Sequence, residues 1–166
     1  LNTYCRYFQA AFLLHKAKRY DITGKKYINS QIKYYFEDIG LRNALLNFRQ
    51  IEETHLMENI IYNELRLRGY NVDVGVVEQR HAETEHQKLE VDFVANLGSK
   101  RIYIQSAFNI PDEAKRMQEI RPFMHIKDAF KRMVITGNNT PTWRDDNGIV
   151  TMNIVDFLLD QNSLDI

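Results

Sequence analysis

The 166-residue sequence contains one cysteine, three prolines and seven glycines, and it has no long hydrophobic run. A single cysteine, Cys5, cannot form an internal disulfide, which argues against a disulfide-stabilised secreted domain. No apolar stretch approaches the roughly 20 residues that span a bilayer, and residues 1–6 do not show the charged-then-apolar order of a signal peptide. We therefore expect one cytoplasmic domain, or one domain with a small appendage, and no membrane partner. Because the chain does not begin with methionine, we also expect it to be part of a longer protein.

Several enzyme motifs are missing as well. The segment Gly24-Lys25-Lys26 lacks the first glycine and the hydroxyl residue of a phosphate-binding P-loop, so no ATP site is expected within this chain. The histidines lack zinc-ligand spacing, and no strand-turn-helix element presents a nucleophilic serine. These absences argue against nucleotide hydrolysis, zinc chemistry and serine hydrolase chemistry.

The net charge is zero, but the charges are unevenly distributed along the chain. Residues 1–50 contain nine Lys or Arg and three Asp or Glu, a net charge of +6, whereas residues 51–166 carry −6. A basic first part can contact the phosphates of nucleic acid, or it can contact an acidic neighbouring domain of the same protein. The candidate nucleic-acid-binding residues are Lys16, Lys18, Arg19, Lys25 and Lys26.

Residues 1–50 are predicted to form a helix, a basic hairpin and a second helix. This order resembles a partial winged helix in which the hairpin is the wing. Wings contact nucleic acid in some modules and pack against other domains in others, so the analogy alone does not decide the function. The predicted elements are a helix over residues 3–14, strands over 16–20 and 25–28, and a helix over 32–46 with a break near Gly40.

Residues 51–166 are predicted to form an α/β/α sandwich with a mixed sheet. Short connections join three strands into a meander, and a crossover helix then leads to a later strand. The predicted helices span 51–68, 111–120 and 155–159, and the predicted strands span 70–78, 88–96, 101–108, 132–136 and 149–154.

Three polar residues follow the order of a metal-dependent nuclease site: Glu58 on a helix, Asp92 on a strand and Gln105 on the next strand. A divalent ion such as Mg²⁺ prefers oxygen ligands, which Asp92 and Gln105 can supply. An active nuclease has a lysine two residues after the second ligand, on the same strand face, and here that position is Ala107. Since losing one such group costs about 100- to 1000-fold in rate, we expect Mg²⁺ binding and cleavage to be weak or absent.

Each candidate also has a structural interpretation. Asp92 can pair with an arginine, Gln105 can be a buried amide satisfied by the backbone, and Glu58 can be a solvated helix residue. Glu90 shares a strand face with Asp92 and is an alternative ligand. The lysines nearest in sequence that could replace the missing one are Lys88, Lys100 and Lys115.

Several stretches together resemble a known family. They are residues 30–43 (SQIKYYFEDIGLRN), 57–65 (MENIIYNEL), 68–70 (RGY), 72–75 (VDVG), 90–94 (EVDFV), 103–107 (YIQSA) and 156–159 (DFLL). They resemble the C-terminal domain of unknown function that follows the ATPase domain in prokaryotic AAA-type ATP-binding proteins. The resemblance implies a preceding ATPase domain, a winged-helix-like segment and a restriction-endonuclease-like, or PD-(D/E)XK, core. It also implies that the degenerate site consists of Glu58, Asp92 and Gln105, with Ala107 as the departure.

We therefore expect a nuclease-like domain that does not cleave and that binds DNA or a partner protein. One alternative is an active Mg²⁺-dependent DNA endonuclease with a relocated lysine, which requires an ammonium group near Asp92. The other is a protein-interaction domain, which predicts no affinity for DNA even at low salt.

Overall fold

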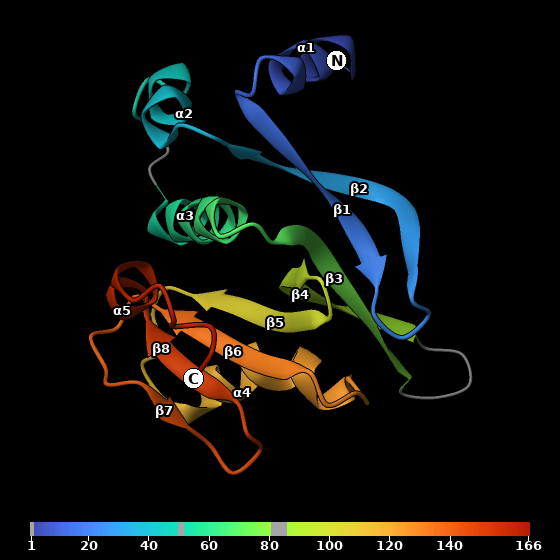
Figure 1. The fold of residues 1–166 in the computed structure, drawn as a ribbon, viewed down its shortest axis with the longest axis vertical. Coiled ribbons are helices and arrows are strands. Elements are labelled where there is room, and N and C mark those ends of the chain that lie inside the picture. Colours follow the sequence, from blue (N-terminus) through green and yellow to red (C-terminus); the bar gives the residue numbers. More distant parts are fainter. Residues whose placement is uncertain (1, 50–51, 81–85) are drawn as a thin grey trace.

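A single mixed sheet of eight strands runs through the computed structural model, which describes residues 2–49, 52–80 and 86–166 (Figure 1). The strand order is β2-β1-β3-β4-β5-β6-β8-β7. The strands are β1 (Leu14–Asp21), β2 (Lys26–Phe36), β3 (Asn71–Arg80), β4 (His86–Leu97), β5 (Lys100–Ala107), β6 (Lys131–Thr136), β7 (Trp143–Arg144) and β8 (Val150–Asn153). The helices are α1 (Asn2–Ala10), α2 (Ile39–Leu45), α3 (Glu53–Leu67), α4 (Glu113–Ile120), the 3₁₀ helix η1 (Arg121–His125) and α5 (Ile154–Leu159).

Helices lie on both faces of this sheet, so the chain has an α/β fold. On one face, α3 and α5 contribute Ile61, Leu65 and Phe157 to a core shared with the strands. On the other face, Ile120 of α4 and Phe123 of η1 form a second core. The apolar residues of α3 recur every three to four positions, and this spacing buries one stripe of the helix against the sheet.

The N-terminal hairpin belongs to the same sheet as the rest of the chain. β1 pairs antiparallel with β2 and parallel with β3, where residues 19–21 lie opposite residues 74–76. Gly75 makes this close packing possible, because a Cβ atom there would lie 2.8 Å from Ile22 Cδ1 and 2.9 Å from Val91 Cβ. The predicted order of helix, hairpin and helix is present as α1, β1–β2 and α2, and the hairpin extends the sheet.

The helix predicted over residues 32–46 is wrong in its first part. β2 continues through Phe36, and α2 begins only at Ile39. Lys33 and Tyr35 turn inward while the residues between and before them are more exposed, which is the two-residue period of a strand. The aromatic residues that suggested a helix also favour a strand, and pairing with β1 decides between the two.

The remaining predicted elements are present with small shifts at their ends. Gly69, with φ of +85°, follows the end of α3, and the N-cap residue of α3 is Glu52. The two-residue strand β7 and the helix η1 were not predicted.

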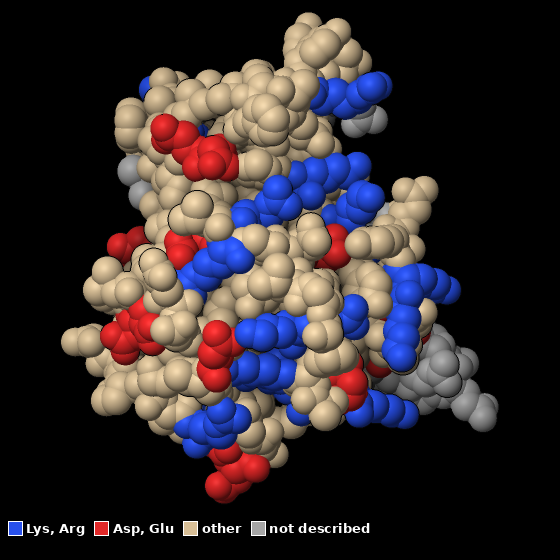
Figure 2. All heavy atoms as spheres, viewed as in Figure 1, with Lys and Arg blue, Asp and Glu red and all other residues tan. Residues whose placement is uncertain are grey.

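In the described parts of the chain, no helix has the length and apolarity needed to cross a membrane. Lys and Arg side chains gather on the face drawn in Figure 2.

Candidate functional site

Asp92 lies where strand β4 separates from β5. The pairing of β4 with β5 extends only as far as Phe93 opposite Ile104. Against β3, the stretch of β4 between Val91 and Val94 contains one residue more than the opposite stretch, which is a β-bulge. Asp92 lies within this bulge, so its main chain is free to bond to side chains of β5.

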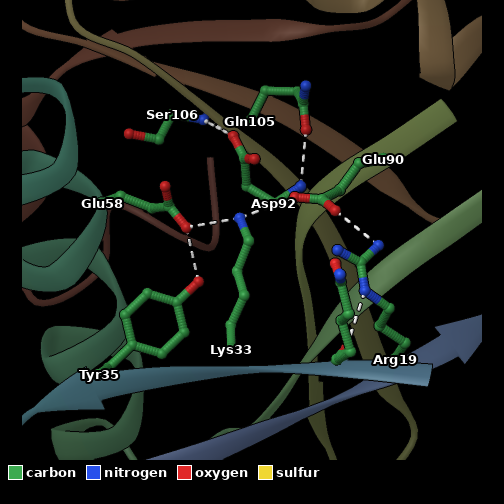
Figure 3. A network of polar contacts seen from close by, with 9 residues as sticks. Arg19, Lys33, Tyr35, Glu58, Glu90, Asp92, Gln105 and Ser106 are labelled. Carbon is green, nitrogen blue, oxygen red and sulfur yellow. Dashed lines mark hydrogen bonds and ion pairs between the residues drawn. The ribbon is translucent and has the colours of Figure 1, made fainter. Parts of the chain in front are cut away.

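Two side-chain hydrogen bonds continue the connection between these strands. The Asp92 N–H donates to Oε1 of Gln105 at 2.8 Å, and Oδ2 of Asp92 accepts from the Ser106 N–H at 2.8 Å (Figure 3). The structure thus brings Asp92 and Gln105 together. The amide oxygen of Gln105, the atom that would coordinate a metal, accepts a backbone hydrogen bond, as its structural interpretation predicted.

The ammonium group of Lys33 joins two carboxylates from different elements. Its Nζ lies 2.9 Å from Oε1 of Glu58 on α3 and 2.7 Å from Oε1 of Glu90 on β4. The Tyr35 hydroxyl donates to Glu58 at 2.6 Å, and Arg19 Nη1 lies 2.6 Å from Oε2 of Glu90. The N-terminal hairpin therefore supplies two cations and a phenol to acids of the later part of the chain (Figure 3).

Packing fixes the positions of Lys33 and Tyr35 on β2. The Tyr35 ring stacks on Tyr62 of α3 with centroids 4.1 Å apart and an interplanar angle of 15°. Burial and then the charge of Glu58 raise the pKa of Tyr35, so the phenol stays protonated and acts as a donor. Neither residue was predicted as part of the site, although the aromatic residues from Tyr34 to Phe36 also favour a strand and could have placed both on one.

Burial raises the pKa of Asp92 to about 7, and the negative charge of Glu58 contributes to the rise. The hydrogen bond from the Ser106 N–H and the charge of Lys33 act in the opposite direction. For Lys33, burial lowers the pKa, but Glu58 and the hydrogen bond to Glu90 outweigh it and the pKa is raised. The ammonium therefore remains charged, while Asp92 changes its charge near neutral pH.

Arg19 and Lys33 balance the charges of Glu58 and Glu90 within this cluster. When Asp92 holds a proton, the four ionised groups sum to zero charge. The site neutralises itself with its own side chains, and this balance agrees with the raised pKa of Asp92.

The donor set does not fit a divalent metal ion. Such an ion needs several oxygen atoms directed at one point, and here the ammonium of Lys33 lies between the two glutamates. In residues 2–49, 52–80 and 86–166, no group of three or more His, Cys, Asp or Glu side chains is arranged to hold a metal. The carboxylates are therefore arranged around an organic cation of the chain itself.

Ala107 is buried in the core between the sheet and α4–η1, on the face away from α3. Two of the lysines nearest in sequence are paired elsewhere, Lys100 with Asp165 at 2.7 Å and Lys115 with Glu119 at 2.5 Å. The third, Lys88, lines a pocket with Arg19 and Glu90. The ammonium at the site comes from Lys33, more than 50 residues earlier in the chain than Lys88.

The basic residues predicted to contact nucleic acid lie in different places. Lys16 and Lys18 line a cleft between β1 and β3, and Lys25 and Lys26 are exposed at the hairpin turn. Arg19 is bound to Glu90 and also donates from Nε to the Gln31 carbonyl at 3.0 Å. The alternation along β1 separates Arg19 from its neighbours and makes it part of the carboxylate cluster.

The fold and the site define an α/β domain with a lysine-bridged carboxylate cluster. The chain belongs to the DUF4143 family, a domain of unknown function, whose profile matches residues 53–162. It is also 35% identical over 159 residues to an uncharacterized protein of Haemophilus influenzae. That match covers 96% of this chain and 36% of the relative, so the chain spans only part of the relative's length. No solved structure matches this chain.

Proposed function

We propose that this chain is a restriction-endonuclease-like domain that does not cleave, joined to a winged-helix-like N-terminal segment in a prokaryotic AAA-type ATPase, and that it binds nucleic acid. The convergence of Glu58 and Asp92 with the neighbouring strand residue Gln105 supports a nuclease-like core. The observation that carries the loss of cleavage is the Lys33 ammonium bound between Glu58 and Glu90.

A lysine ammonium in this position compensates charge but cannot replace the chemistry of a metal ion. A bound divalent ion polarises a phosphoryl oxygen and lowers the pKa of its water, and both effects require open coordination positions. The Lys33 ammonium offers hydrogen bonds, which Glu58 and Glu90 accept. A nuclease-like core with this arrangement retains its shape while losing the means to activate water.

The same ammonium favours one rival function, an active nuclease in which Lys33 replaces the missing lysine. Lys33 acts electrostatically on Asp92, as a relocated catalytic lysine would. The two functions differ in what happens when the ammonium is removed. In our proposal Lys33 excludes the metal, whereas in the rival Lys33 is needed for cleavage.

The test is a calorimetric titration of Mg²⁺ and Mn²⁺ into the wild type and Lys33→Gln, together with cleavage assays on linear and branched DNA. We expect no heat of binding and no cleavage for the wild type. Lys33→Gln is expected to gain Mn²⁺ affinity, because it leaves Glu58 without its internal cation and Glu90 with Arg19 alone, and a further Asp92→Asn change should reduce that gain.

Lys127→Gln is the matched control, because Lys127 is exposed and follows η1 on the opposite face of the sheet. It should behave as the wild type does. Metal-dependent cleavage by the wild type that both Lys33→Gln and Asp92→Asn abolish would establish the rival nuclease and end our proposal. Circular dichroism of each variant shows whether it is folded.

Exposed aromatic side chains on α1 favour a second candidate function, a protein-interaction domain. Tyr4 and Tyr7 of α1 are 71% and 66% exposed, and Phe12, which follows the helix, is 75% exposed. Aromatic residues are enriched at the centres of protein interfaces. This candidate predicts no binding of any nucleic acid even at about 50 mM salt, where contacts to phosphates are strong.

A further inference from the structure

A cleft opens where β1 diverges from β3. The two strands pair only where residues 19–21 lie opposite residues 74–76, and before this point they separate. The cleft has a volume of about 540 Å³. The residues that line it come from β1, β2, α3, β3, β4 and β5. It is separate from the carboxylate cluster, since none of Lys33, Glu58 and Asp92 lines it.

Four cationic side chains line this cleft, and they are Lys16, Lys18, Arg66 and Arg101. Within the described ranges of the chain, none of the four forms an ion pair with a carboxylate, unlike Lys33 and Arg19 of the carboxylate cluster. One carboxylate, Asp73, lies in the lining, where it accepts a hydrogen bond from the Tyr27 hydroxyl at 3.0 Å. The lining therefore carries a net charge of +3, and Figure 2 shows Lys and Arg side chains crossing this face.

The spacing of the cationic side chains, and the contacts that hold Arg101 in place, suit the binding of successive phosphates. Lys16 and Lys18 are two residues apart on one strand, so they leave the same face about 6.5 Å from each other, a spacing comparable to that of successive phosphates in an extended strand. Arg101 is held by the hydrogen bond from its Nε to Asn96 Oδ1 at 2.7 Å. The Cζ atom of its guanidinium lies 5.2 Å from the centroid of the Tyr20 ring.

Aromatic rings stand beside these cations. Tyr20 and Tyr27 meet edge to face with centroids 5.6 Å apart, and Tyr27 is 58% exposed. Lys18 Nζ lies 5.2 Å from the centroid of the Tyr27 ring. Cations that bind phosphates, together with rings on which bases stack, are the combination that proteins use for single-stranded nucleic acid.

We propose that the cleft between β1 and β3 binds a single-stranded nucleic acid, with phosphates on Lys16, Lys18, Arg66 and Arg101 and a base on Tyr27. The inference deepens the proposed nucleic-acid-binding function and rests on it. A duplex is the poorer ligand, because its bases are stacked on each other and cannot offer their faces to Tyr27.

The test is fluorescence anisotropy with labelled single-stranded oligothymidylate, the corresponding RNA and a duplex of the same length. For the wild type we expect the single strands to bind more tightly than the duplex. The double variant Lys16→Gln/Lys18→Gln should reduce the slope of log affinity against log salt by about 1.4, at about 0.7 for each phosphate contact. Tyr27→Ala should weaken binding about tenfold through lost stacking, whereas Tyr27→Phe should retain it.

The control is the double variant Lys115→Gln/Lys127→Gln, which removes the same charge from the opposite face of the sheet and should bind as the wild type does. Thymidine monophosphate should not compete at concentrations at which the oligonucleotide saturates the protein, and efficient competition would identify a nucleotide pocket instead. Tight binding that the cleft variants leave unchanged would overturn the cleft as the site while the proposed function stands. Binding of neither single strand nor duplex would end both.

Discussion

A carboxyl group whose pKa lies near 7 changes its charge within the physiological range, and Asp92 is such a group. Burial raises its pKa from 3.8 to about 7, with Glu58 adding to the effect. Between these two values the folded protein holds a proton that the unfolded chain has released. Folding takes up a proton in this pH window. The contribution of Asp92 to the free energy of unfolding therefore falls as the pH rises from about 4 to about 7, and it is constant above that.

The first prediction concerns Asp92→Asn, which keeps the shape of the side chain and an oxygen for the Ser106 N–H. A pKa rise of this size corresponds to about 4 kcal/mol. The variant should therefore unfold with a free energy about 2 to 4 kcal/mol above the wild type at pH 8, and this difference should be about 2 to 3 kcal/mol smaller at pH 5. Urea unfolding at pH 5, 6, 7 and 8 measures this difference.

Asp146→Asn, at an exposed loop residue, is the control and should show no such dependence on pH. If Asp92→Asn were less stable than the wild type at pH 8, the Asp92 carboxylate would be stabilised in the folded protein, and the raised pKa would be wrong.

The acids of the site could be predicted from the sequence, but their cations could not. Glu58, Asp92 and Gln105 lie on α3, β4 and β5, in an order along the chain that indicates a nuclease-like site, and Asp92 and Gln105 do contact each other. Lys33 lies in a segment whose aromatic residues satisfy both helical and strand spacing. Because its partners are 25 and 57 residues away, only the pairing of the hairpin with the sheet brings it to the site.

At the scale of elements, Asn59 of α3 connects the helix to the end of β2. Its Oδ1 accepts from the Phe36 N–H at 2.9 Å, and its Nδ2 donates to the Phe36 carbonyl at 2.8 Å. Asn63, one turn later, donates to the same carbonyl at 2.9 Å. These hydrogen bonds give partners to the N–H and carbonyl groups of Phe36, where β2 ends. They also hold the strand that carries Lys33 against the helix that carries Glu58.

The second prediction is that Asn59→Ala lowers the free energy of unfolding by about 2 kcal/mol. The partly buried Phe36 N–H loses its acceptor, and an unsatisfied donor that is shielded from water costs about 1 to 3 kcal/mol. Equilibrium urea unfolding measures the loss. Gln118→Ala removes an amide from the exposed side of α4 and should change stability by no more than about 0.5 kcal/mol. Equal losses in the two variants would mean that the Asn59 bonds do not hold β2.

Element boundaries could be predicted where a period persists and a glycine or proline marks one end, as Gly69 does after α3 and Pro111 does before α4. The bulge at Asp92 and the divergence of β1 from β3 depend on residues far apart in the sequence. No local pattern marks either, so the shapes of the site and of the cleft required the structure.

At the scale of the whole molecule, three pairs of residues in parallel register join β1 to β3. Gly75 lies at the centre of this junction, where it pairs with Tyr20 of β1 and Val91 of β4. The junction sets the position of the entire hairpin, and therefore that of the two cations of the carboxylate cluster and one wall of the cleft.

The third prediction is that Gly75→Ala destabilises the protein by about 1 to 3 kcal/mol, the usual cost of overpacking a close contact. The added methyl group would meet Ile22 Cδ1 at 2.8 Å and Val94 Cγ2 at 2.9 Å. Amide hydrogen exchange should accelerate in residues 19–21 and 74–76 more than in β5 and β6. Gly24→Ala is the matched control, because its methyl group would meet only the side chains of the half-buried Asp21 and the exposed Lys26 at the hairpin turn. Uniform acceleration across the sheet would show that the junction is not a separate weak point.

Both cations of the carboxylate cluster precede residue 53, where the match to the family begins. A protein truncated at that boundary would retain Glu58, Glu90 and Asp92 and lose Lys33 and Arg19. It would also expose β3 as an unpaired sheet edge, a site of aggregation. Any metal affinity measured on such a truncated protein would arise from the truncation, because the hairpin that supplies the internal cations would be missing.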